Sequence, residues 1–183
     1  MIIARQKRKE NIAEYLLYMW QVEDLIRANQ FDMDSINRTV IAHYDQPEEV
    51  KREIARWYEE LIEMMRGEGV MEKGHIQLNR NVILSLTDLH LRLLKSPAEM
   101  IYSAAYYKTL PYIIQLRAKS GGEDLPELET CFSAVYGYLL LRMQGKEVSA
   151  ETLEGIKQIS SFLALLAEKY REDMKGTLKL EDY

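Results

Sequence analysis

Apolar residues recur at intervals of three and four along nearly the whole chain, and this spacing constrains the fold more than any other feature of the sequence. Residues at these intervals share one face of an α-helix, whereas a half-buried strand needs alternation with a period of two, which no segment sustains. With 9 Gly and 4 Pro among 183 residues, few positions interrupt a helix. The sequence therefore predicts an all-α fold. The clearest stripe consists of Ile12, Tyr15, Leu16, Met19, Val22 and Ile26.

Start and stop signals divide the chain into helices joined by short connections. Pro47 and Pro97 are suited to the first turn of a helix, Ser149 is a typical N-cap, and glycines follow several expected helix ends. Short connections favour antiparallel neighbours, so we expect an antiparallel helical bundle of about six to seven helices. Pro111 should kink or break the fifth helix near Tyr107. The expected helices cover about 7–28, 34–44, 47–66, 76–95, 97–120, 124–143 and 150–174.

Length and composition predict the domain organisation. A chain of this length with 47% hydrophobic residues can bury a full core, so we expect one all-helical domain over residues 1–175. The glycine-bounded connection 67–74 is the expected internal hinge, and residues 176–183 form an expected loose tail.

Charge and apolar run length indicate a cytoplasmic protein. The formal net charge of −5 argues against general affinity for nucleic acid or anionic membrane. The N-terminus lacks a signal peptide, and no apolar run approaches the roughly 20 residues that cross a bilayer. The single cysteine, Cys131, cannot form an intramolecular disulfide, which fits a reducing compartment.

Five polar residues fall where the helical pattern predicts apolar ones. Burying a polar group is unfavourable unless it is paired, so such residues are either structural pairs or parts of a site. If Glu23 and Arg27 pair at the edge of the core, they are structural. If the helices bring all five together, they line a polar pocket for a small ligand. The candidate cluster consists of Glu23, Arg27, His43, Asn79 and His90.

The common signatures of catalysis are missing from the sequence. Glu72 precedes His75 by three residues, as in the Glu-x-x-His pairs of di-iron bundles, but this pair lies in the glycine-bounded connection and not on a helix face. The zinc motif His-Glu-x-x-His, the nucleophile elbow Gly-x-Ser-x-Gly and the phosphate-binding loop are absent. Cys131 lies among core residues and is expected to be inert. We therefore expect no catalytic residues, no metal and no cofactor.

Tyrosine is unusually common, with 12 Tyr against 3 Phe, and it concentrates on three of the expected helices. An amphipathic ring suits an interface, a pocket rim or an ordinary core. The sequence favours a non-catalytic interaction or adaptor protein that associates with itself or another protein through a Tyr-rich or Met-rich surface. The alternative is a bundle, with or without enzymatic activity, that binds a small molecule through the inward polar cluster. The tyrosines in question are Tyr15, Tyr18, Tyr102, Tyr106, Tyr107, Tyr112, Tyr136 and Tyr138.

Two segments carry a family resemblance. In these two segments the chain resembles an uncharacterised family of Bacteroides-type bacteria. The first segment, residues 7–24, reads Lys-Arg-Lys-Glu-Asn-Ile-Ala-Glu-Tyr-Leu-Leu-Tyr-Met-Trp-Gln-Val-Glu-Asp, and the second is Gly74-His75-Ile76. The resemblance extends over the whole chain, and the family is classified as a domain of unknown function. It implies a small, all-helical bacterial protein of the cytosol, and it supplies no catalytic residues.

Overall fold

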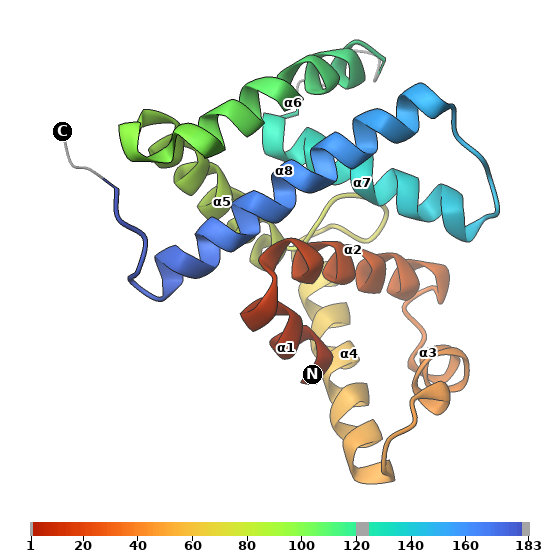
Figure 1. Cartoon of the computed structure of the whole chain (residues 1–183). Coiled ribbons are helices and arrows are strands. Elements are labelled where there is room, and N and C mark those ends of the chain that lie inside the picture. The colour runs from red at the N-terminus through yellow and green to blue at the C-terminus, as the bar shows by residue number, and fades with distance from the viewer. Residues whose placement is uncertain (1, 120–124, 181–183) are drawn as a thin grey trace. The chain divides into compact units, whose positions relative to one another are not determined.

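In a computed structural model, every regular element of the described residues, 2–119 and 125–180, is helical (Figure 1). The all-α prediction is confirmed, but these ranges hold eight α-helices and two short 3-10 helices instead of six to seven helices. Antiparallel bundle packing stays a prediction. The elements are α1 (Ile2–Glu10), α2 (Ile12–Ala28), α3 (Met33–Thr39), η1 (Ile41–His43), α4 (Glu48–Gly67), α5 (Gln77–Lys95), η2 (Pro97–Glu99), α6 (Met100–Lys119), α7 (Glu127–Met143) and α8 (Ala150–Met174).

The extra helix arises because the first expected helix is divided at Asn11. The Asn11 side chain accepts a hydrogen bond from the Ala13 backbone N–H at 3.0 Å, as an N-cap does, so α2 begins anew after α1. The second expected helix is also shorter than its apolar spacing suggests. It ends at Thr39, and a single 3-10 turn follows.

The later helix starts agree with their local signals, with one exception. Ser149 caps α8 by accepting a hydrogen bond from the Thr152 N–H at 3.2 Å. Ser96 precedes η2 without a side-chain cap bond, and the buried Glu99 pairs with Lys169 at 2.8 Å. Pro111 lies inside α6, which continues through it. The expected stop at residues 121–122 lies outside the described residues.

The chain divides into two compact units. Unit 1 comprises the described residues of 1–10 and 14–82, and unit 2 those of 11–13 and 83–183. The boundary falls inside α5, between Val82 and Ile83, and not in the 67–74 connection where the sequence predicts a hinge. The single domain over 1–175 stays a prediction.

Each unit buries its own set of apolar side chains. In unit 1 these come mainly from α2 and α4 and include Leu16, Met19, Trp20, Ile26, Ile54, Tyr58, Leu61 and Met65. In unit 2, α6, α7 and α8 contact one another (Figure 1). Their buried side chains include Tyr102, Ile113, Leu128, Cys131, Phe132, Ile159, Phe162 and Leu166.

No helix in the described ranges is long and apolar enough to cross a membrane. After α8 the chain turns at residues 175–176, and residues 177–180 carry no regular structure. The remainder of the expected loose tail, residues 181–183, lies outside the described residues.

Candidate functional site

Glu23, on α2, is fully buried and has three hydrogen-bond partners in unit 1. Its Oε1 accepts from the backbone N–H of Ile76 and from the side-chain amide of Asn79, each at 2.9 Å. Its Oε2 lies 2.6 Å from Nδ1 of His75. The helical spacing of α2 places Glu23 inward, as the sequence predicts, and the protein itself supplies the groups that stabilise the buried carboxylate.

His75 belongs to this cluster but is not one of the five residues that the helical pattern predicts. Its ring stacks on the indole of Trp20, with 4.1 Å between ring centroids and 7° between planes, and its side chain is 23% exposed. A carboxylate at Nδ1 favours the tautomer that carries its proton there and its lone pair on Nε2. His75 lies in a loop, where helical periodicity gives no signal. The sequence marks His75 only through the loop pair with Glu72 and through the family resemblance.

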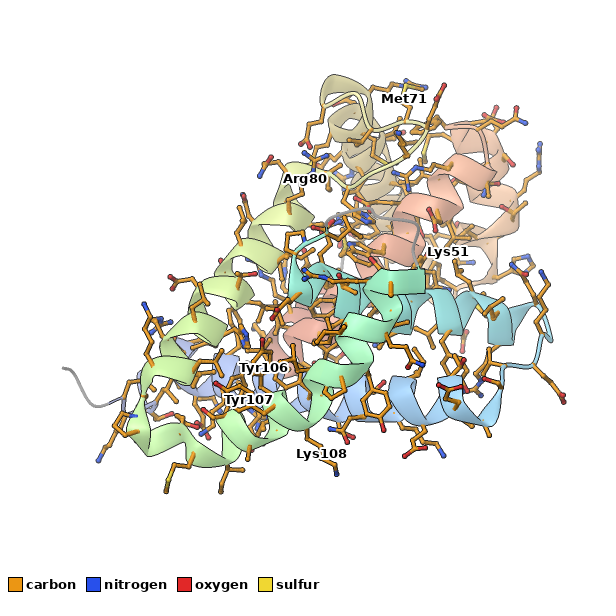
Figure 2. All side chains as sticks on the ribbon, turned by 90° about the horizontal axis from the view of Figure 1, so that it is seen from above. Lys51, Met71, Arg80, Tyr106, Tyr107 and Lys108 are labelled. Carbon is orange, nitrogen blue, oxygen red and sulfur yellow. The ribbon has the colours of Figure 1, made fainter. Side chains whose placement is uncertain are left out.

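A Glu23–Arg27 pair is one of the two interpretations of the sequence, but Arg27 binds other groups. Its guanidinium binds Asp24 at 2.8 Å and donates to the carbonyl oxygens of three residues in the loop that precedes α5. An arginine has five N–H donors in a fixed plane, so one side chain can hold several carbonyls at once. The loop carbonyls belong to Val70, Met71 and Gly74, and Met71 is labelled in Figure 2.

The same contacts place negative charge at the start of α5. Glu23 accepts the Ile76 N–H, and the carboxylate of Glu68 accepts the Gln77 N–H. The first N–H groups of a helix have no partner within it, and the helix dipole favours anions at this end. Glu23, Arg27 and Asn79 therefore come together, with His75, as an anchor that fixes the 70–77 segment to α2.

The other two candidate residues do not join this anchor. His43 is exposed in η1, so the prediction that it faces inward is wrong. A projection at 3.6 residues per turn fails there because α3 has already ended. His90 is buried, as predicted, but it belongs to unit 2. Within the described ranges, no three His, Cys, Asp or Glu side chains are arranged to hold a metal ion.

His90 lies in an aromatic environment of unit 2. Its Nδ1 is 2.7 Å from the hydroxyl of Tyr102, and its ring packs edge-on against Tyr106 and Phe162. Burial lowers the pKa of His90 and raises the pKa of the Tyr102 hydroxyl. A neutral imidazole nitrogen can accept a hydrogen bond from the Tyr102 hydroxyl, so both groups have a partner and the contact is a structural pair.

The exposed surface of unit 2 carries an apolar stripe along α6. Met100, Tyr107 and Ile114 are 75%, 64% and 59% exposed, and Tyr107 and Lys108 can be followed along this helix in Figure 2. We call the stripe the outer face of α6. All of its members are exposed: Met100, Ala104, Tyr107, Pro111, Ile114 and Ala118.

The opposite side of α6 is covered within unit 2. Tyr106 donates a hydrogen bond to Glu127 of α7 at 2.7 Å, and Thr109 accepts one from Gln158 of α8 at 3.1 Å. Tyr102 lies 5.6 Å from Phe162 of α8, between ring centroids. The helix is therefore apolar on two sides, of which the unit covers one.

A family model described as a domain of unknown function (DUF4924) matches residues 1–177, so the chain belongs to that family. No curated protein and no solved structure matches the chain. The expected family of unknown function is confirmed, whereas the bacterial origin stays a prediction.

Proposed function

We propose that this DUF4924 protein is a non-catalytic interaction protein that associates with a second copy of itself through the outer face of α6. The observation that supports the proposal is the stripe of six exposed apolar residues, spaced three or four positions apart, on that face. Single exposed apolar side chains are normal on a protein surface, whereas a contiguous apolar stripe is typical of an interaction site.

The composition of α6 supports the same conclusion. A helix that packs on one side only is normally polar on the other, while a helix that is apolar all round is normally buried all round. The sequence of α6 contains no acidic residue, and its exposed side includes isoleucine, tyrosine and methionine. Association would remove these side chains from water, at about 25 cal/mol for each Å² of apolar surface buried.

The alternative, binding of a small ligand by the inward polar cluster, has weaker support. Both oxygens of Glu23 already accept hydrogen bonds from protein groups, and Arg27 is occupied by loop carbonyls and Asp24. His43 is exposed, and His90 has its own partner in Tyr102. The contacts of these residues are those of a structural anchor and a core pair.

Sedimentation velocity over a wide concentration range tests the proposal. We expect reversible self-association that Ile114→Glu weakens at least tenfold, because a carboxylate would be desolvated in the contact. Leu84→Glu is the matched control, since Leu84 is equally apolar, 63% exposed and in the same unit, but on α5. A chain that stays monomeric at every concentration, or one that Leu84→Glu disrupts and Ile114→Glu does not, contradicts the proposal.

A further inference from the structure

We infer that two copies pair through antiparallel α6 helices, with the two-fold axis passing beside position 109. This inference rests on the proposed function and specifies the orientation and register of the partner. It follows from the spacing of the outer face and from the sizes of its side chains.

The outer face has the spacing of a helix-pairing seam. Its successive members are separated by four, three, four, three and four residues. Alternation of three and four is the spacing that keeps one stripe of a helix against a partner helix over several turns. The six positions span nearly the whole of α6, so the seam is as long as the helix.

Large and small residues alternate along the seam, and the order of sizes selects the orientation. In an antiparallel pair centred on position 109, each large residue meets a smaller one of the second copy. Alternation of this kind lets side chains from facing helices interdigitate. The three layers, each formed twice by symmetry, are Met100 with Ala118 of the second copy, Ala104 with Ile114 of the second copy, and Tyr107 with Pro111 of the second copy.

A parallel pair in register has a poorer arrangement. Every residue would face its own counterpart, so the layers of Met100, Tyr107 and Ile114 would be crowded and those of Ala104 and Ala118 would leave gaps. Crowding and cavities are both destabilising in a packed interface. The antiparallel arrangement is also isologous, so two copies complete it and no open chain of molecules results.

The size of the face sets the expected strength of the pair. The 20 residues of α6 span about 30 Å, and a strip about 10 Å wide gives roughly 300 Å² on each copy. Stable interfaces bury about 800 Å² on each partner. In addition, Lys108 lies beside the seam close to the two-fold axis, so it would approach Lys108 of the second copy, and the two positive charges would repel each other. We therefore expect a weak, rapidly exchanging dimer with a dissociation constant of micromolar order or above.

Cross-linking of single-cysteine variants tests the register. Ala104→Cys and Ile114→Cys are made in the otherwise unchanged full-length protein, since both positions are exposed and Cys131 is buried. The probe is a bismaleimide with a span of about 8 to 10 Å, the separation of packed helix axes. In the inferred register, residue 104 lies opposite residue 114 of the second copy. It is ten residues, or about 15 Å, from the other residue 104 along the helix axis.

We expect covalent dimers when the two variants are mixed, with a yield at least fivefold above that of either variant alone. The protein without an introduced cysteine is the control for reaction at Cys131. Dimers from each variant alone, without enrichment in the mixture, would overturn the antiparallel register. Association that sedimentation detects but Ile114→Glu leaves unchanged would overturn both the register and the face. If sedimentation shows a strict monomer, the proposed function fails, and the inference fails with it.

Discussion

Replacement of Glu23 by alanine should destabilise unit 1 more than any surface change on the same helix. The carboxylate is fully buried and accepts hydrogen bonds from Ile76, Asn79 and His75. Alanine leaves the Ile76 N–H at the start of α5 without its partner and withdraws the acceptor that orients the His75 ring. Both effects act on the segment that α2 anchors.

The magnitude follows from these three contacts. Hydrogen bonds to a charged group contribute about 1.5 to 3 kcal/mol each, but they are not additive, and removal of a buried carboxylate also removes its desolvation penalty. Deletion of Glu23 leaves the neutral donors of Ile76 and Asn79 without their acceptor, at about 1 to 3 kcal/mol for each buried unsatisfied donor, so we expect about 2 to 4 kcal/mol for Glu23→Ala. Glu23→Gln keeps the shape and one acceptor oxygen, so about 1 to 2 kcal/mol is expected.

Urea denaturation followed by tryptophan fluorescence measures this change. Both tryptophans, Trp20 and Trp57, belong to unit 1, so their emission reports on that unit. Far-UV circular dichroism in parallel shows whether the two signals share one transition, which a free energy of unfolding requires.

Glu14→Ala is the matched control, because Glu14 is an acidic residue of the same helix whose side chain is 61% exposed. Its loss should change the free energy of unfolding by less than about 1 kcal/mol. If Glu23→Ala is neutral or stabilising, the structural anchor is refuted. A neutral or stabilising effect is what we expect if Glu23 belongs to a binding site, because such sites hold energetically unfavourable groups in place for function.

Three further predictions concern unit 2. Burial lowers the pKa of His90 below its ordinary 6.5, so the unfolded chain binds more protons below that pH, and the free energy of unfolding should fall on acidification. The difference between the urea midpoints at about pH 5 and pH 7.5 should be smaller in His90→Asn than in the unchanged protein. An equal difference in the two proteins would contradict this reasoning. Gly137→Ala should stabilise α7 by about 0.5 to 1 kcal/mol in thermal or urea melts, because its Cβ meets nothing within 4 Å. Gly155→Ala should gain less, because its Cβ would lie 3.0 Å from Cδ1 of Tyr112; the opposite ranking would refute this reasoning. Burial raises the pKa of the Cys131 thiol to about 12, so an aromatic disulfide reagent at neutral pH should modify the native protein far more slowly than the unfolded one, and comparable rates would show an open core.

Local chemistry explains why much of the helix pattern could be predicted. The bounds of α8 follow from Ser149 and the spacing behind it, and α7 begins at Glu127, where the sequence predicts a helix over 124–143. The missed division at Asn11 was also local, because asparagine is a good N-cap, but an apolar stripe that continues across it hides the break. The boundary between the units depends on packing, and no residue type marks it.

The partners in the candidate site could be predicted only in part. The helix period places Glu23 inward, but it cannot choose among Arg27, Asn79 and a histidine 52 residues away in a loop. Arg27 points to the loop carbonyls because the backbone there offers several acceptors together. For α6, the spacing of three and four residues can be recognised in the sequence, but the helix is apolar on two sides and the sequence does not show which side is buried. Only packing against α7 and α8 shows which side is left exposed.

The start of α5 has a consequence for the order of events during folding. Its Ile76 N–H is capped by a side chain that lies 53 residues earlier, whereas Ser149 caps α8 from three residues away. A nearby cap can form together with its helix, but a distant one forms only after the intervening chain has closed into a loop, at an entropic cost. The first turn of α5 should therefore be among the last parts of unit 1 to acquire protection from hydrogen exchange during refolding. Pulse labelling that finds this turn protected as early as the first turn of α3, a helix of the same unit that Asp32 caps locally, would contradict that order.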